Sequence, residues 1–327
     1  MPDSSSEPAP AGEACVAAAV KSLSPAQAIE GWDQSLREMA LVLRNTRLDG
    51  EWLARLERVT QRMLALARHD LDTALYLLFQ HASQDSGQYS ARHAVLCAIV
   101  CEQCAAWFDW ADDEVHSLVC AALTMNVSMS ALHDALTRHT GPLSKLQRRE
   151  IDDHAVNSAA LLVQAGVTDT LWLEVVRAHH KPAPAMTEQP LPPATRLAQL
   201  LRRVDIYTAK LSRRSSRAAT TPSIAARDAC LDDSGLPDAI GATILRMLGL
   251  FPPGSFVRLA SGEVGVVVRR GVKAHTPIVA LLRRADGGVS ARALRRDTAF
   301  QQYAVVRGMS TTDVKIRFQH ERVLQAP

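Results

Sequence analysis

The sequence predicts a mainly α-helical protein with a small antiparallel β module at its C-terminal end. Three observations predict this class. Only 5% of the residues are aromatic, and alanine and leucine are abundant, a composition that favours helices. Apolar residues recur at helical spacing through most of residues 24–248. From residue 251 the pattern changes to short apolar runs separated by glycine-containing turns, which is typical of strands.

Length and charge distribution predict more than one unit. A chain of 327 residues is about two domains long by the usual domain size. The net charge of +3 does not indicate a nucleic-acid-binding protein as a whole, but the charge is unevenly placed. Residues 251–327 contain 13 Lys and Arg against 5 Asp and Glu, and the rest contains 24 against 29. We expect a disordered segment over 1–22, an N-terminal helical segment over 23–84, a helical bundle over 85–250 and a small basic β module over 251–327.

The helices of the N-terminal segment have recognisable start signals. Ser24 and Pro25 suit the N-cap and first position of a helix over 24–45. A second helix is expected over 50–69, and Asp70 can cap a third one that follows it.

The bundle is predicted from periodic apolar segments separated by polar or proline-rich stretches. Two of its helices, within Arg149–His180, are joined by a turn at Gly166. The other helices are expected over 90–108, 112–130, 195–212, 223–230 and 237–248, and a polar stretch over 132–144 is expected to interrupt them. Beyond residue 251 we expect a β-hairpin, a further strand within 277–289 and a short strand over 315–318.

The cysteines do not indicate a metal or redox motif. The chain has Cys15, Cys97, Cys101, Cys104, Cys120 and Cys230. The C-x-x-C at Cys101 and Cys104 lies in an apolar helical run without a second pair or a neighbouring strand, so buried reduced thiols are favoured. The N-terminus has no signal pattern, and no run is expected to reach transmembrane length. We therefore expect a cytoplasmic protein that does not contact a membrane.

Five residues on the apolar helices are of types that bind divalent metals: His93, His154, His179, His180 and Asp205. Neutral imidazole and carboxylate are good ligands for borderline divalent cations. Burying five such groups without partners would be costly. Each one alone is also compatible with a hydrogen-bonded polar group in a helical core, and composition and periodicity leave both interpretations open.

The spacing of these residues resembles the HD superfamily of metal-dependent phosphohydrolases, and more closely its HD-GYP branch of cyclic di-GMP phosphodiesterases. The resemblance covers about residues 89–282. Position 125 follows His93 by 32 residues, His154 follows after 29 more, and His179-His180 after another 25. The segment D-I-Y-T-A-K-L-S-R-R-S-S-R then starts at Asp205. The resemblance implies an HD-type helical bundle and the five residues as metal ligands.

The same segment supplies Arg214 and Arg217, which the resemblance implies as contacts to substrate phosphate. Guanidinium groups suit phosphate oxygens. A solvated basic helix end is the alternative interpretation.

Several positions depart from the family pattern. Met125 and Asn126 occupy the positions of its His-Asp pair, whose carboxylate bridges two metals in the family. Tyr89 stands where the family has Glu, and Met129 where it has a substrate-contacting Lys. Residues 181–193 replace the G-Y-P loop. The pair His133-Asp134 lies eight residues too late to supply the missing ligands, and we expect it not to bind metal.

Two functions follow from this pattern. The first is a divergent HD-GYP-like protein of bacterial cyclic di-GMP signalling. It would hydrolyse or bind a phosphodiester or cyclic dinucleotide at a residual His-rich site with Fe, Mn or Zn. The second is a catalytically inactive, HD-derived scaffold or signalling protein that acts through protein contacts. Met125 and Asn126 favour the second function, whereas the His179-His180 pair and Asp205 favour the first.

The basic β module has two interpretations. It could dock to a nucleic acid or an acidic partner, or its charge could belong to a solvated face. The second is favoured, because no basic motif interleaved with aromatic residues of the RNA-binding kind is present.

Overall fold

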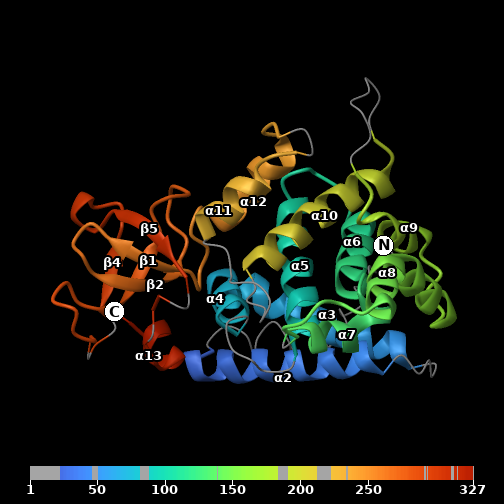
Figure 1. Ribbon diagram of the computed structural model, residues 1–327, viewed down its shortest axis with the longest axis horizontal. Helices are drawn as coiled ribbons and strands as arrows, with labels where there is room; N and C mark the ends of the chain where they lie inside the picture. The colour runs from blue at the N-terminus through green and yellow to red at the C-terminus, as the bar shows by residue number, and fades with distance from the viewer. Residues whose placement is uncertain are drawn as a thin grey trace, which may run out of the picture.

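The computed structural model describes residues 23–45, 51–81, 88–137, 139–182, 191–211, 222–232, 235–290, 292, 294–310, 313–314 and 316–326. In these residues the protein is mainly helical, with a five-stranded antiparallel sheet near the C-terminal end (Figure 1). The predicted fold class, a helical bundle with a C-terminal β module, is therefore confirmed. The segment 1–22 and the residues Arg214 and Arg217 lie outside the described residues.

The N-terminal helices begin where the sequence predicts. They are α2 (Pro25–Arg44), α3 (Trp52–His69) and α4 (Leu71–His81). Ser24 Oγ accepts the Gln27 N–H and Gln27 Oε1 accepts the Ser24 N–H, a capping box that fixes the start of α2. Asp70 caps α4 by accepting the N–H of Thr73 at 3.0 Å. Helix α2 runs along the base of the molecule in Figure 1 and packs against α3 and α5.

The bundle is built around one buried helix. Its helices are α5 (Tyr89–Ala105), α6 (Asp112–Thr124), α7 (Ser130–Leu136), α8 (Lys145–Gln164), α9 (Thr170–Ala178), α10 (Pro193–Leu211), α11 (Pro222–Ala229) and α12 (Ala239–Leu248). Helix α5 is buried along nearly its whole length and packs against α6 and α10. The predicted turn at Gly166 separates α8 from α9, and its φ of +87° explains the glycine.

Two predicted boundaries in this region are wrong. The helix expected over 112–130 ends at Thr124, and a turn with the short 3₁₀ helix η2 (Val127–Met129) follows. The stretch 132–144, expected to interrupt the helices, contains most of α7. Neither Gly nor Pro marks the break. Hydrogen bonds to helix α8 stabilise the turn after Thr124 instead. The Ser128 N–H donates to Ser158 Oγ, and Ser128 Oγ donates to the His154 carbonyl.

A further correction concerns the hydropathy of this region. The segment Asp112–Leu136 has the length and the mean hydropathy, 1.4, of a membrane span, which the sequence analysis did not expect. Of the 18-residue apolar window within it, 67% is buried inside the protein. A buried core helix of a globular protein passes the same test.

The sheet has the strand order β4-β3-β2-β1-β5, and all neighbours are antiparallel. Its strands are β1 (Phe256–Leu259), β2 (Val264–Arg269), β3 (Ile278–Arg283), β4 (Arg295–Asp297) and β5 (Val305–Met309). The predicted hairpin is confirmed as β1 and β2. The 3₁₀ helix η3 (Gln301–Tyr303) precedes β5, and α13 (His320–Leu324) follows it and contacts α2. Strands β4 and β5 and helix α13 were not predicted. The described residues of 315–318 do not form the expected strand.

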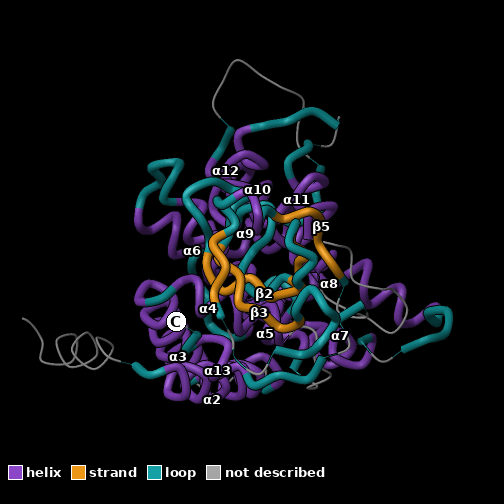
Figure 2. Tube along the Cα trace, turned by 90° about the vertical axis from the view of Figure 1, so that its left-hand side faces the viewer, coloured by secondary structure: helices purple, strands orange, loops and turns teal. Residues whose placement is uncertain are grey.

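One continuous hydrophobic core joins the N-terminal helices, the bundle and one face of the sheet. A smaller cluster covers the other face: Phe251, Val257, Leu259, Val267 and Val279. Polar contacts reinforce the junction, because Gln80 Nε2 donates to the Gly254 carbonyl at 2.5 Å and Arg270 bonds both Asp72 and the Met247 carbonyl. Figure 2 shows the strands in front of the helices. The domain boundaries near 84 and 250 stay predictions.

Candidate metal centre

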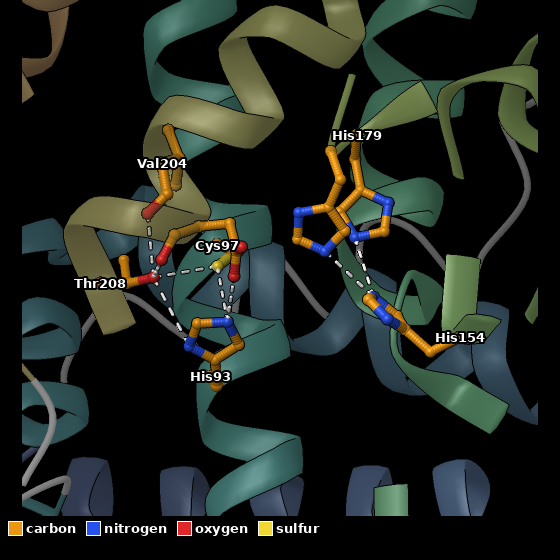
Figure 3. A network of polar contacts seen from close by, with 8 residues as sticks. His93, Cys97, His154, His179, Val204 and Thr208 are labelled. Atoms are coloured by element: carbon orange, nitrogen blue, oxygen red, sulfur yellow. Dashed lines mark hydrogen bonds and ion pairs between the residues drawn. The ribbon is translucent and has the colours of Figure 1, made fainter. Parts of the chain in front are cut away.

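Helices α8 and α9 bring three histidines together. A capping box at Ser144 and Gln147 starts α8, and His154 lies in its middle. Asp169 caps α9 by accepting the Trp172 N–H, and His179 and His180 follow directly after this helix ends. Figure 3 shows the His154 ring facing two imidazole rings that include His179.

The ring nitrogens of this group converge. His154 Nε2 lies 3.3 Å from His179 Nε2 and 3.1 Å from His180 Nε2. His154 and His179 are buried, whereas His180 is partly open to solvent. Two nitrogens bound tetrahedrally to one cation at about 2.0–2.1 Å would lie about 3.3 Å apart. The separations in this cluster therefore suit three ligands of one ion.

The other ring nitrogens settle the tautomers of two of these histidines. His154 Nδ1 lies 2.5 Å from the Ile151 carbonyl, and His179 Nδ1 lies 2.7 Å from the Val176 carbonyl. A carbonyl only accepts, so both Nδ1 atoms carry the hydrogen and Nε2 of each neutral ring carries a lone pair. Backbone acceptors of this kind are the usual way in which a metal-binding imidazole is oriented.

The surroundings of His179 and His180 disfavour the charged forms of these two rings. Burial, helped by the neighbouring His180, lowers the pKa of His179 to about 3. Burial also lowers the pKa of His180, partly opposed by the negative charge of Asp205. Ring nitrogens whose lone pairs point toward one another repel, and this repulsion favours the binding of a cation between them. A donor set of three imidazoles fits a divalent metal with a further coordination position open.

The other two predicted ligands form a separate group between α5 and α10. His93 Nε2 lies 2.7 Å from Asp205 Oδ1, and Thr208 Oγ1 lies 3.5 Å from His93 Nδ1. Cys97 Sγ approaches both His93 Nε2, at 3.7 Å, and Thr208 Oγ1, at 3.2 Å. Figure 3 shows this group beside the histidine cluster. The five predicted ligands therefore lie in two groups of three and two, not around one point.

His93 and Asp205 form a buried ion pair. Burial alone would lower the pKa of His93, but Cys97, Tyr89 and the hydrogen bond to Asp205 together raise it well above its ordinary value. Burial alone would raise the pKa of Asp205. The hydrogen bond to His93 outweighs the effect of burial, so the pKa of Asp205 lies well below its ordinary value. His93 Nε2 and Asp205 Oδ1 engage each other in this pair, and together with Cys97 they offer ligand atoms within 4.8 Å of one another.

Met125 and Asn126 occupy the turn after α6. Met125 is fully buried and Asn126 is half-buried. Their side chains, a thioether and a neutral amide, add no anionic ligand to either group.

The pair His133-Asp134 makes structural contacts. Asp134 accepts the Ser90 N–H at 2.7 Å at the start of α5, and its other oxygen pairs with Arg44 at 2.5 Å. The His133 ring packs edge-on against Tyr89 and His93, with centroids 4.7 and 5.5 Å apart. Asp134 therefore supports the start of α5, and both its carboxylate oxygens are engaged.

Sequence reasoning missed two features. It did not place Cys97 and Thr208 beside His93. It also missed a group on other helices, Glu57, His116 and Cys120, whose ligand atoms lie within 4.8 Å of one another. A signal was present, because His93 with Cys97 and His116 with Cys120 both read H-x-x-x-C. The expected burial of Cys101 and Cys104 is confirmed, and the described cysteines are all free thiols: Cys97, Cys101, Cys104, Cys120 and Cys230.

Comparison with known proteins gives one distant relative. The chain is 24% identical over 189 residues to a cyclic di-GMP phosphodiesterase of Pseudomonas aeruginosa. The matched region covers 57% of this chain and 45% of that protein, so the chain spans less than half of its relative's length. No protein-family model matches the chain, and no solved structure gives a significant match. The chain is thus distantly related to a cyclic di-GMP phosphodiesterase.

Proposed function

We propose that this chain is a divergent HD-GYP-like protein of bacterial cyclic di-GMP signalling. It binds one divalent cation, iron, manganese or zinc, through His154, His179 and His180, and binds or hydrolyses a phosphodiester there. One observation carries the proposal: the three Nε2 atoms converge, at 3.1 and 3.3 Å from His154. The distant likeness to a cyclic di-GMP phosphodiesterase supports the substrate class.

The chain's own residues have distinct roles in this proposal. A divalent cation at such a site supplies Lewis acidity, which activates water and polarises a phosphoryl oxygen. The carbonyls of Ile151 and Val176 orient the two buried rings with their lone pairs inward. His180 is the exposed member, so a ligand would reach the group from its side. Arg214 and Arg217, outside the described residues, are proposed to hold phosphate oxygens.

The second candidate is a non-catalytic scaffold, and the His93–Asp205 pair favours it. Two-metal hydrolysis needs two cations about 3.5–4 Å apart. His93 and Asp205 engage each other instead, at 2.7 Å, and Met125 and Asn126 supply no bridging carboxylate. In this alternative the bundle is a docking surface for a protein partner.

Metal analysis and a cyclic di-GMP assay on the same samples test the proposal. The whole chain is purified without chelator, and its metal content, its binding of cyclic di-GMP and its turnover with added manganese or iron are measured. His180→Ala is the variant of choice, because His180 is the exposed member of the cluster. His275→Ala is the matched control, since His275 is an exposed histidine in the loop between β2 and β3.

The proposal expects stoichiometric metal in the wild type and in His275→Ala, and a large loss in His180→Ala. Cyclic di-GMP binding or turnover should fall in parallel. Metal-free wild-type protein that neither binds nor hydrolyses cyclic di-GMP would contradict the proposal and leave the scaffold function.

A further inference from the structure

A second cluster of metal-binding side chains lies where α3 meets α6. It consists of Glu57 from α3 and of His116 and Cys120 from α6. One ligand atom from each residue lies within 4.8 Å of the other two. Cys120 is buried, Glu57 is half-buried and His116 is exposed, so the cluster opens to solvent on the His116 side. The proposed function does not involve these residues.

The geometry of the α6 pair matches that of two ligands on one ion. His116 and Cys120 are four residues apart, which places them on the same face of the helix. Cys120 Sγ lies 3.6 Å from His116 Nε2. With zinc bonds of about 2.3 Å to sulfur and about 2.05 Å to nitrogen at a tetrahedral angle, the two atoms would be about 3.5 Å apart. The pair therefore needs almost no movement to bind.

Glu57 completes the set from the neighbouring helix, and its carboxylate is already oriented. Gln61, one turn further along α3, donates to Glu57 Oε1 at 2.8 Å. The other carboxylate oxygen can then face α6. Hydrogen bonds of this kind to ligating carboxylates are common around metal sites. The α6 pair and Glu57 together give one sulfur, one nitrogen and one oxygen donor.

We infer that Glu57, His116 and Cys120 form a zinc site that links α3 to α6. Thiolate, imidazole and carboxylate together select Zn²⁺ over the hard cations Mg²⁺ and Ca²⁺, which prefer all-oxygen sites. Three protein ligands leave the fourth position to water on the exposed side. On binding, the Cys120 thiol gives its proton to solvent and the S–H bond is replaced by a zinc–sulfur bond. The inference is independent of the proposed function, because the three-histidine cluster shares no residue with this site.

Cobalt titration tests the inference, because Co²⁺ takes the place of zinc and a cobalt–thiolate bond gives a charge-transfer band in the near ultraviolet. The three-histidine cluster contains no sulfur and cannot produce that band. The other H-x-x-x-C pair, His93 with Cys97, supplies a matched control on α5. The whole chain is titrated as wild type, Cys120→Ser, His116→Ala, Cys97→Ser and Gln61→Ala, with far-ultraviolet circular dichroism to check folding.

We expect the band in the wild type and in Cys97→Ser, its loss in Cys120→Ser, and its loss or strong weakening in His116→Ala. Added Zn²⁺ should abolish it. Gln61→Ala should keep the band with affinity lowered about tenfold, the usual effect of losing a partner of a ligand. Absence of the band in folded wild-type protein, or a band that survives Cys120→Ser, overturns the inference. A full-strength band in folded His116→Ala protein also overturns the inference.

Discussion

The Nε2 atoms of His154 and His179 lie 3.3 Å apart, on two different helical segments, and in the neutral rings neither of these atoms carries a hydrogen. Each ring already donates its Nδ1–H to the backbone carbonyl three residues earlier. Two nitrogen lone pairs at this separation repel each other, and a cation between them removes that repulsion. This relationship makes metal binding the first property to test.

Metal removal should destabilise the wild-type protein. A ligand that binds only the folded state at 100 times its dissociation constant adds about 2.7 kcal/mol to the free energy of unfolding. We expect added Mn²⁺, which the thiolate-containing α3–α6 site does not favour, to raise the melting temperature of chelator-treated protein. The shift should be much smaller in His154→Ala and unchanged in His275→Ala. Equal shifts in all three proteins would show that the metal acts elsewhere.

Asp205→Asn should destabilise the fold whether or not metal binds. It leaves His93, whose side chain is only 2% exposed, without its charged partner. Breaking a buried ion pair from one side costs about 3–5 kcal/mol. Asp228→Asn is the control, since the Lys210–Asp228 pair is about one-third exposed and should contribute less than about 1 kcal/mol. Urea unfolding measures both, and similar losses would contradict the distinction.

Asp134→Asn should affect stability but not metal content. The substitution removes the charge that meets the Ser90 N–H and Arg44 at the start of α5. Losing a capping carboxylate costs about 1 kcal/mol. We expect a lower urea midpoint with the same metal content as the wild type. Reduced metal in a folded variant would mean that His133-Asp134 takes part in binding after all.

Restoring the family pattern at the α6 turn should add metal. The double substitution Met125→His and Asn126→Asp places an imidazole and a carboxylate at these two positions. They are the positions of the His-Asp pair in the family that the sequence resembles. We expect metal content above that of the wild type, and hydrolysis of cyclic di-GMP to rise. Asn126→Asp alone should give part of the effect, because the carboxylate supplies the charge. Unchanged metal content in the folded double variant would count against the proposed HD-type site.

The β module should lose stability in acid through Glu263. The hydrogen bond from Arg296 lowers the pKa of this buried carboxyl below its ordinary 4.5. A lowered pKa in the folded state gives stability that is present above the ordinary value and is lost as the pH falls through the folded one. Glu263→Gln should therefore flatten the decline in unfolding free energy below about pH 4.5. If the free energy of unfolding falls equally with pH in the wild type and in Glu263→Gln, this assignment is contradicted.

Local signals in the sequence predicted most helices correctly. Ser24 with Pro25, Asp70 and Gly166 mark boundaries by capping and turn chemistry, which a sequence displays directly. The break after Thr124 carries no such signal, because hydrogen bonds that Ser128 donates to Ser158 and to the His154 carbonyl stabilise it. Strands β4 and β5 were missed for a related reason: they are short and partly exposed, and only pairing with β3 and β1 makes them strands.

The candidate site was predictable in its members but not in its grouping. Spacing identified His154, His179 and His180, which the structure brings together. It could not show that His93 faces Asp205 instead, because that contact depends on how α5 packs against α10. The cluster of Glu57, His116 and Cys120 was missed because its third member comes from a distant part of the chain.

The close approach at Gly254 has a practical consequence. A Cβ on this glycine, whose φ is +93°, would lie 2.8 Å from Phe79 Cβ, so the start of the sheet and helix α4 touch at backbone distance. With the hydrophobic core continuous across this junction, helices and sheet should exchange their slowest amide hydrogens together and melt in a single step. A shortened protein that ends before Phe251 would expose that shared surface to water, so binding assays belong on the whole chain.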